Sequence, residues 1–389
     1  MRILIVLTYY RPHISGLTIY VQRLARALAK RGHQVTVLTS QYDKALPSEE
    51  MIDGVRIVRA PVLLRISKGV IMPTFGYLAW KLVLEHDIIH LHLPQFDAAG
   101  VALRGRLLKK PTVISYHCDL KLPPSLFNRI VNQIVHLMNF LAGVFTHRIG
   151  AYTEDFAGHS PYLRFFSKKV EVILPPVELP KVSQNEVETF GVSNNPQKKH
   201  PIIGMATRFA SEKGVEILLE ALPQIFEKHP NAMVLYAGQY QDVMGEEAYL
   251  SRLLPKIRDY ITKGQWKFLG TLNPVQMAAF YPNLDVLVVP SLNSTETFGL
   301  VQIEAMINGV PTVASNLPGV RQPPLMTGMG EVTAIGDVDD LAKGICKILA
   351  FPKNYEGKPE EIARTFAPDI NAAAYERVYQ DLMRTLRKS

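Results

Sequence analysis

The chain is poor in cysteine and has no long apolar run. Its 389 residues include two cysteines, Cys118 and Cys346, too few for a disulfide framework or a cysteine-ligated metal cluster. No segment reaches the roughly 18 consecutive apolar residues of a membrane-spanning helix. The apolar run after Arg2, ILIVL, is shorter than the central part of a secretory signal peptide, and no small-residue cleavage site follows it. We therefore expect a protein of the cytoplasm.

Motifs of two other protein classes are missing as well. The first turn from strand to helix lacks the G-x-G-x-x-G pattern, which counts against an NAD-dependent oxidoreductase. The sequence also lacks a dense Lys/Arg run with interleaved aromatic residues, a zinc-ligand spacing and an RNA-recognition motif. Nucleic acid is therefore not an expected partner.

Charge is unevenly distributed along the chain. The net charge is +8, but residues 1–180 hold 22 Lys/Arg against 12 Asp/Glu, and the remainder holds 21 against 23. A basic first half indicates either an anionic partner or a plain solvated surface, and both interpretations stay open at this point.

Short apolar runs alternate with helical periodicity, which predicts an α/β fold. A polar, proline-rich segment over 175–200 interrupts this alternation and indicates a domain boundary. We predict two doubly wound Rossmann-like domains, 1–180 and 181–369, facing a central cleft, and a terminal helix within 370–389. The predicted strands are 3–7, 34–38, 55–59, 88–92, 112–116, 148–152 and 170–174, then 202–206, 233–237, 266–269, 286–289 and 312–314.

The segment 289–311, VPSLNSTETFGLVQIEAMINGVP, is the most informative part of the chain. A strand ends in a polar loop that carries Glu296 and Gly299, and a helix with Glu304 follows. A helix start offers backbone N–H groups to a phosphate, and two carboxylates beside it suit sugar hydroxyls. This combination fits a nucleotide-sugar.

A second cluster of polar residues follows strand 202–206. Arg208 and Lys213 lie on the loop and Gly214 begins the next helix, an arrangement that suits a diphosphate. An ordinary solvated pair of cations is the alternative. Gly238 ends the strand MVLYAG, where a side chain would block a ligand.

Two candidate residues lie in the first domain. Gly16 stands at the entry to a helix and permits close approach of a phosphate, although a plain strand–helix turn would look the same. His117 ends the strand TVISYH, where an imidazole could bond a sugar hydroxyl. A buried histidine with satisfied hydrogen bonds is the structural alternative.

Taken together, these segments resemble family 4 of the retaining glycosyltransferases over essentially the whole chain. The E-x7-E motif ETFGLVQIEAMINGVP, the RFASEKG stretch, the ISYH segment and ARALAKRGHQVTVLT at 25–39 follow the order of that family. The resemblance implies the GT-B architecture, with the terminal helix crossing back onto the first domain. It also implies transfer of a hexose from a nucleotide diphosphate-sugar to an acceptor hydroxyl, for which we prefer a UDP-sugar over GDP-mannose.

The resemblance also assigns roles to residues. Glu296 would bond hydroxyls of the donor sugar beside the N–H groups of Phe298, Gly299 and Leu300, and Glu304 would hold the ribose.

The remaining implied roles concern the diphosphate and the transferred sugar. Arg208 and Lys213 would bind the diphosphate, Gly16 would approach it from the first domain, and His117 would contact the transferred sugar. Because fixed cations and helix ends stabilise the leaving group, the family needs neither a metal nor another cofactor. In the first loop Ser15 and Thr18 depart from the family pattern of paired glycines followed by an acidic residue.

Other functions remain open on sequence grounds. A sugar-nucleotide epimerase or a phosphorylase could use the same architecture. A two-domain sugar-binding protein belongs to another class, and the expected diphosphate site counts against it.

Two stretches of the first domain could contact lipid. Residues 62–80 mix Arg65 and Lys68 with large apolar residues, and 125–145 form a long helix whose only Lys, Arg, Asp or Glu is Arg129. With the basic balance of this domain, an anionic membrane surface is a candidate partner and the acceptor could be a lipid or a lipid-linked glycan. A helix packed against the sheet is the alternative.

Overall fold

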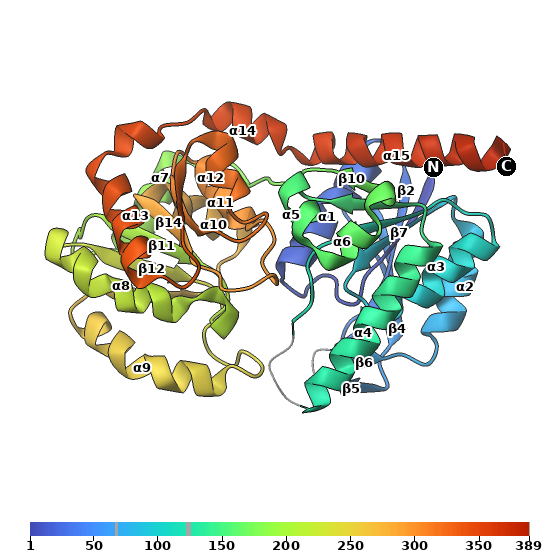
Figure 1. Cartoon of the computed structure of the whole chain (residues 1–389), viewed down its shortest axis with the longest axis horizontal. Helices are drawn as coiled ribbons and strands as arrows, with labels where there is room; N and C mark the ends of the chain where they lie inside the picture. Colours follow the sequence, from blue (N-terminus) through green and yellow to red (C-terminus); the bar gives the residue numbers. More distant parts are fainter. Residues whose placement is uncertain (67–68, 122–125, 389) are drawn as a thin grey trace. The chain divides into compact units, whose positions relative to one another are not determined.

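A computed structural model describes residues 1–66, 69–121 and 126–388 of the chain. The chain forms two compact units, of which unit 1 comprises Met1–Pro176 together with Phe366–Ser389, and unit 2 comprises Val177–Thr365 (Figure 1). The boundaries predicted from sequence lay after residues 180 and 369. Lys68, one of the two cations noted above for lipid contact, and Ser125, the first residue of the predicted long helix, lie outside the described residues.

Unit 1 contains an eight-stranded sheet that is parallel except for the pair β3–β4. The strand order reverses between β1 and β7, and ligands of open parallel sheets bind beyond the carboxyl ends of the strands at such a reversal. A separate two-stranded sheet pairs β5 (Leu64–Ile66) antiparallel with β6 (Gly69–Ile71). In sheet order the strands are β10 (Val170–Val172), β9 (Arg148–Ala151), β8 (Thr112–Tyr116), β7 (Ile88–Leu93), β1 (Arg2–Val6), β2 (Gln34–Gln41), β4 (Val55–Pro61) and β3 (Glu49–Ile52).

The two faces of this sheet differ in chemistry. Successive residues of a strand point to opposite faces. On β7, Leu91 and Leu93 join an apolar cluster with side chains of α2 and α3, whereas His90 and His92 face α1 and α15. The helices of unit 1 are α1 (Gly16–Lys30), α2 (Phe75–Glu85), α3 (Ala98–Leu107), α4 (Leu126–Phe145), α5 (Glu154–His159), α6 (Pro161–Phe165) and α15 (Pro368–Lys388).

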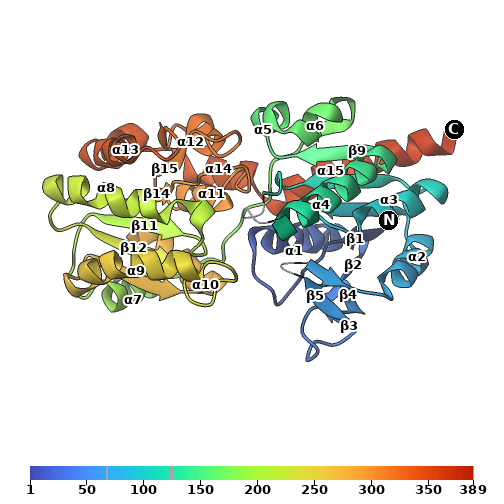
Figure 2. The same cartoon turned by 60° about the horizontal axis from the view of Figure 1, so that its bottom comes forward.

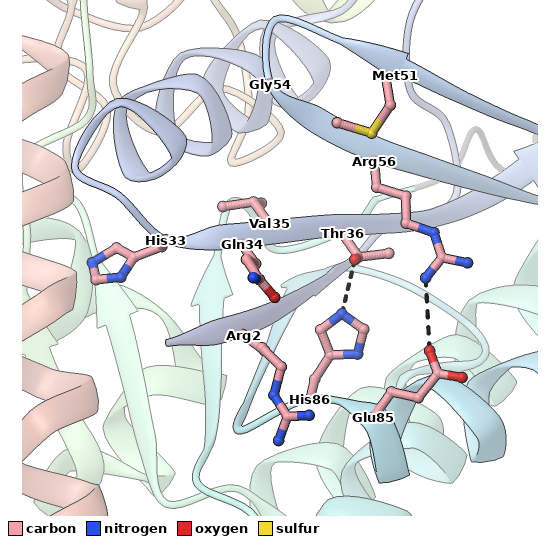
Figure 3. A pocket seen from close by; sticks show the side chains of 10 residues that line it. All are labelled: Arg2, His33, Gln34, Val35, Thr36, Met51, Gly54, Arg56, Glu85 and His86. Atoms are coloured by element: carbon pink, nitrogen blue, oxygen red, sulfur yellow. Dashed lines mark hydrogen bonds and ion pairs between the residues drawn. The ribbon is translucent and has the colours of Figure 1, made fainter.

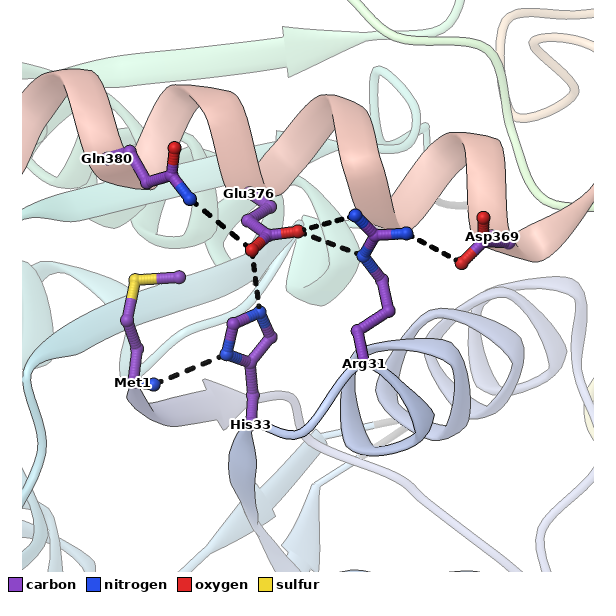
Figure 4. Close-up of polar contacts among 6 residues, drawn as sticks. All are labelled: Met1, Arg31, His33, Asp369, Glu376 and Gln380. Atoms are coloured by element: carbon purple, nitrogen blue, oxygen red, sulfur yellow. Dashed lines mark hydrogen bonds and ion pairs between the residues drawn. The ribbon is translucent and has the colours of Figure 1, made fainter.

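Charged residues fasten α15 to the end of α1. Arg31 caps α1 and forms ion pairs with Asp369 at 2.8 Å and with Glu376 at 2.7 Å. Glu376 also meets the His33 ring at 3.4 Å and the Gln380 amide at 3.3 Å (Figure 4). The last helix of the chain is therefore part of unit 1.

Helix α4 presents its apolar side to solvent. Ile130, Ile134 and Leu137 are 55%, 43% and 53% exposed, whereas Asn139 is buried and its Oδ1 accepts a hydrogen bond from the backbone N–H of Gln95. This orientation is the reverse of an ordinary amphipathic helix on a sheet, which buries its apolar side. Among the described residues, no helix combines the length and apolarity needed to cross a membrane.

Unit 2 contains a six-stranded, fully parallel sheet whose order reverses between β11 and β14 (Figure 2). In sheet order the strands are β13 (Trp266–Gly270), β12 (Met233–Ala237), β11 (Ile202–Ala206), β14 (Val286–Val289), β15 (Thr312–Ser315) and β16 (Gly330–Thr333). The helices are α7 (Gln184–Asn194), α8 (Val215–Lys228), α9 (Glu247–Thr262), α10 (Pro274–Phe280), α11 (Leu300–Met306), α12 (Gln322–Thr327), α13 (Val338–Ala350) and α14 (Pro359–Thr365).

Candidate active site

A lysine–glutamate pair lies at the strand-order reversal of unit 2. Lys213 follows β11 and Glu296 follows β14, the two strands that flank the reversal. The Lys213 ammonium is 2.6 Å from Oε2 of Glu296, and their side chains are only 14% and 23% exposed. The structure thus brings together two of the predicted site residues at the edge where ligands of parallel sheets bind.

Backbone contacts hold these two loops together. The N–H of Leu292 donates to the carbonyl of Glu212 at 2.9 Å. Gly214 has φ +68°, and a Cβ at that position would lie 2.1 Å from the Pro290 carbonyl oxygen. Only glycine fits this close approach, so Gly214 allows the Lys213 and Glu296 loops to meet.

Arg208 and Gly238 occupy the neighbouring part of the same edge. The Arg208 guanidinium forms an ion pair with Glu212, and its side chain remains 41% exposed. Gly238 has φ +134° and stands so close to Thr207 that a Cβ would lie 2.0 Å from the Thr207 carbonyl oxygen. The glycine is therefore required by its own chain packing, whatever it contributes to a ligand site.

Helix α11 carries the second motif glutamate on a buried face. Oε2 of Glu304 accepts the Tyr281 hydroxyl at 2.7 Å, and the residue is largely buried. Gly299, with φ +74°, is the N-cap of this seven-residue helix, and Leu300 is the first helical residue. The Tyr281 hydroxyl thus fixes the position of the Glu304 carboxylate.

A glutamine braces the loop that precedes α11. The Gln302 amide donates to the carbonyl of buried Phe298 at 2.8 Å and to that of Val320 at 2.9 Å, and its Oε1 accepts the Thr312 hydroxyl at 3.1 Å. These hydrogen bonds of Gln302, and the partners Glu212 and Tyr281, were not predicted from the sequence. Of these contacts, the Arg208–Glu212 ion pair could have been predicted, because the two residues are four positions apart.

The unit 1 candidates lie at the carboxyl edge of its sheet. Gly16 is the first residue of α1, capped by Ser15 Oγ, which accepts the Thr18 N–H at 3.2 Å. A Cβ on Gly16 would meet nothing within 4 Å, so its own surroundings do not require glycine.

His117 follows β8 and is buried rather than open. Both ring nitrogens are hydrogen-bonded, Nε2 to Nδ1 of His92 at 2.9 Å and Nδ1 to the Tyr152 hydroxyl. Burial lowers the pKa of His117 to about 3, so the ring is neutral at ordinary pH. His117 is thus a buried histidine with satisfied hydrogen bonds, which is the alternative named in the sequence analysis. Its predicted role in sugar binding stays a prediction.

Metal-binding groups are not evident in the part of the chain that the structure describes. No three side chains of His, Cys, Asp or Glu in residues 1–66, 69–121 and 126–388 are placed to hold a metal ion. The clustered histidines His90, His92 and His117 do not form such a set either.

A hollow of about 500 Å³ lies at the opposite end of the unit 1 sheet. It is lined by residues at the amino ends of β1, β2 and β4 and at the end of α2 (Figure 3). Its charged groups pair with near neighbours: Arg2 with Asp87 at 2.7 Å, and Arg56 with Glu49 at 2.6 Å and with Glu85 at 3.6 Å. None of the predicted site residues belongs to it.

Comparison with known proteins gives two family matches that together cover most of the chain. The model described as Glycosyltransferase Family 4 matches residues 14–179, and the model described as Glycosyl transferases group 1 matches residues 187–365. An uncharacterized glycosyltransferase of Methanocaldococcus jannaschii is 27% identical over 344 residues, covering 83% of this chain and 82% of that protein.

Two further similarities extend over the full length. Phosphatidyl-myo-inositol mannosyltransferase of Mycobacterium leprae is 25% identical over 395 residues, covering 98% of this chain and 96% of the relative. The solved structure of Anabaena Alr3699/HepE in complex with UDP-glucose has a TM-score of 0.75 at 19% identity, with all of both chains covered. The chain belongs to the family 4, group 1 glycosyltransferases, and its fold is GT-B.

Proposed function

We propose that this protein is a retaining glycosyltransferase that moves a hexose from a nucleotide diphosphate-sugar to an acceptor hydroxyl without a metal ion. The observation that carries the proposal is the Lys213–Glu296 pair at the strand-order reversal of unit 2. A cation there suits a diphosphate, and a carboxylate beside it suits sugar hydroxyls.

The proposed reaction uses these groups as follows. The bond between the anomeric carbon and the diphosphate oxygen breaks, and a bond to the acceptor oxygen forms on the same face of the sugar. The acceptor proton passes to the departing diphosphate. Lys213 and Arg208 stabilise the charge that develops on this leaving group, which is the work that a divalent ion performs in other transferases.

The remaining candidate residues bind the donor. Glu296 accepts sugar hydroxyls, and Glu304, fixed by Tyr281, accepts hydroxyls of the ribose. Gly16 lets the diphosphate approach unit 1, and His117 contacts the transferred sugar.

A UDP-sugar is the preferred donor, and GDP-mannose is the competitor. The HepE structure named above holds UDP-glucose, whereas the mycobacterial relative is named for mannosyl transfer. The two names support different donors, so nucleotide-binding measurements have to identify the base.

Nucleotide binding and transfer test the proposal. We expect UDP or GDP to bind in the presence of a chelator, and Lys213→Ala to weaken binding by about tenfold, because a charge-assisted contact is lost. Glu296→Gln should keep the nucleotide affinity and lower the rate of transfer. The matched control is Lys347→Ala, which removes another Lys–Glu pair of unit 2, Lys347–Glu331 at 2.8 Å.

Four outcomes contradict the proposal. They are equal nucleotide affinity in the Lys213→Ala and Lys347→Ala variants, a requirement for a divalent metal, inversion at the anomeric carbon of the product, and epimerisation of the donor without an acceptor.

We further propose that the acceptor is a lipid or a lipid-linked glycan and that α4 attaches unit 1 to an anionic membrane surface on the cytoplasmic side. The exposed apolar side of α4 supports this, since water does not favour a continuous row of Ile130, Ile134 and Leu137. Helix α3, which packs beside α4, carries the exposed cation Arg106 in its last turn, and the exposed Lys109 follows the end of the helix. Basic side chains beside an apolar helix face suit anionic headgroups.

Vesicle co-sedimentation tests the membrane proposal. The protein should sediment with vesicles that contain phosphatidylglycerol, and salt should weaken the binding. Ile134→Asp combined with Leu137→Asp should abolish it, whereas Phe351→Asp, at an exposed apolar residue of unit 2, should not. Absence of binding at low ionic strength, or equal loss in both variants, would overturn this proposal.

A further inference from the structure

Polar contacts hold the ring of His117 on two sides inside unit 1. Besides its hydrogen bonds to His92 and Tyr152, the ring packs against Tyr20 in a T-shaped arrangement, with 4.9 Å between ring centroids and an interplanar angle of 86°. The ring can therefore turn only if both hydrogen bonds break and Tyr20 gives way. This restraint comes from three separate elements, β7, the end of β9 and α1.

A second layer of polar contacts supports His92. The ring of His90 stacks on that of His92 with 4.4 Å between centroids. Nε2 of His90 lies 2.8 Å from the Ser115 hydroxyl and Nδ1 lies 2.6 Å from the Tyr379 hydroxyl. The hydroxyl of Tyr375 meets Ser115 at 2.6 Å. Helix α15 thus closes the network from a position more than 250 residues along the chain from His90.

The sheet leaves room for this helix at one glycine. A Cβ on Gly150 of β9 would lie 2.6 Å from the Tyr375 hydroxyl oxygen, so a larger residue would push the tyrosine out of the network. The Tyr375 hydroxyl also lies 3.0 Å from that of Tyr20, which ties α15 to the residue that packs on His117.

The proton positions follow from the partners. A neutral imidazole has one donor and one acceptor nitrogen. Nε2 of His92 is buried and has no hydrogen-bond partner among the described residues, and a buried N–H without an acceptor is rarer than an unpaired acceptor. His92 therefore carries its proton on Nδ1 and donates to Nε2 of His117, which leaves the His117 proton on Nδ1, pointing at Tyr152.

We propose that Tyr152 and His92 are positioning residues that hold His117 as the neutral Nδ1–H tautomer, and that Tyr375 and Tyr379 of α15 complete this support. The kinetic part of this inference rests on the proposed function. Positive charge develops at the anomeric carbon during glycosyl transfer, so a cationic imidazolium nearby would oppose the reaction. A neutral ring in one fixed orientation avoids this repulsion.

Nuclear magnetic resonance of ¹⁵N-histidine tests the tautomer independently of catalysis. The signals of His117 are assigned by their loss in His117→Gln. We expect the proton on Nδ1 in the wild-type protein and a shift toward Nε2 in Tyr152→Phe, because the Nδ1 proton loses its acceptor. Finding the proton on Nε2 in the wild type, or no change in Tyr152→Phe, overturns the inference.

Kinetics of the same variant provide the second measurement. Tyr152→Phe should lower kcat by about tenfold and leave the KM for the donor within about twofold, since a misplaced group costs rate rather than binding. The matched control is Tyr162→Phe, which removes a buried hydroxyl of unit 1 that has no hydrogen-bond partner among the described residues. Equal losses of kcat in the two variants would contradict a positioning role.

Two substitutions of His92 separate positioning from packing. Asn can place an amide donor near the position of Nδ1, whereas Leu cannot, so His92→Asn should retain more kcat and more of the wild-type tautomer than His92→Leu. The reverse order overturns the inference. If the wild-type protein transfers no sugar from any donor, the proposed function fails, and the tautomer measurement still decides this inference.

Discussion

At the scale of single residues, Lys213 and Glu296 form an ion pair with each other. Their contact of 2.6 Å lies in a largely shielded position, where attraction between charges is stronger than in water. The diphosphate proposed to bind Lys213 would therefore meet an ammonium oriented by Glu296, and it would also meet the negative charge of Glu296. The orientation of the ammonium favours diphosphate binding, whereas the negative charge of Glu296 opposes it. On the same loop, the Arg208 guanidinium pairs with the Glu212 carboxylate and so neutralises that second negative charge.

Replacing Gln302 should destabilise the loop that precedes α11, because its side chain holds that loop by hydrogen bonds. Gln302→Met keeps the side-chain length but leaves the carbonyls of Phe298 and Val320 without the amide donor. We expect the free energy of unfolding of unit 2 to fall by about 1–3 kcal/mol, the usual cost of unsatisfied buried polar groups. Denaturant titration measures it, with Gln224→Met, at an exposed glutamine, as the control. A change of equal size in the two variants would show that the brace is not specific.

At the scale of elements, the predicted strands of both sheets are present because buried parallel strands consist of short apolar runs. Strand β3 was missed because its four residues, EEMI, alternate between exposed and half-buried and carry two glutamates. Helix α4 was recognised, but its orientation was not predictable, because a stripe of Asn132, His136 and Asn139 has the same spacing whichever side faces the sheet.

The side-chain pairs within the candidate site could not be predicted from the sequence either. Lys213 and Glu296 are 83 residues apart, and only the adjacency of β11 and β14 brings them together. Likewise Tyr379 is 289 residues from His90, so its hydrogen bond depends on where α15 packs. The loops that carry Lys213 and Glu296 could be located in the sequence, because the start of a helix and the end of a strand depend on neighbouring residues.

The buried histidines predict that unit 1 is sensitive to acid. Burial lowers the pKa values of His90 and His117 to about 3, whereas an unfolded chain protonates histidine near its ordinary pKa of 6.5. Between pH 6.5 and 3 the unfolded state therefore binds more protons than the folded state. As the pH falls through this range, each of these histidines lowers the free energy of unfolding by about 1.4 kcal/mol per pH unit. Asp97 acts in the opposite direction, because burial raises its pKa to about 6.

His90→Asn measures this contribution. The fall in the free energy of unfolding from pH 7 to pH 5 should be smaller in this variant by about 2 kcal/mol, which is one histidine over 1.5 units below pH 6.5. Denaturant titrations at the two pH values give the number, and His159→Gln, at an exposed histidine, is the control. An unchanged pH dependence in His90→Asn would show that His90 is not kept neutral by the fold.

At the scale of the whole molecule, the two units have separate hydrophobic cores and different chemistry. Unit 1 buries a histidine–tyrosine network under α15, and unit 2 carries the Lys213–Glu296 pair. Each unit contains one of the two tryptophans of the chain, Trp80 in α2 and buried Trp266 in β13. Fluorescence can therefore report on each unit by itself.

We expect opposite responses of the two tryptophans. In Trp80→Phe, the remaining Trp266 should report a higher melting temperature when UDP or GDP binds, since a ligand at 100 times its Kd stabilises its site by about 2.7 kcal/mol. In Trp266→Phe, the remaining Trp80 should report a lower melting temperature at pH 5 than at pH 7, because of His90 and His117. The nucleotide should act more strongly on the Trp266 transition and acid more strongly on the Trp80 transition. The contrary outcome is that both tryptophans report one transition, whose midpoint moves equally with nucleotide and with pH. The chain would then unfold as a single cooperative unit, and the donor site and the histidine network would not stabilise the two units separately.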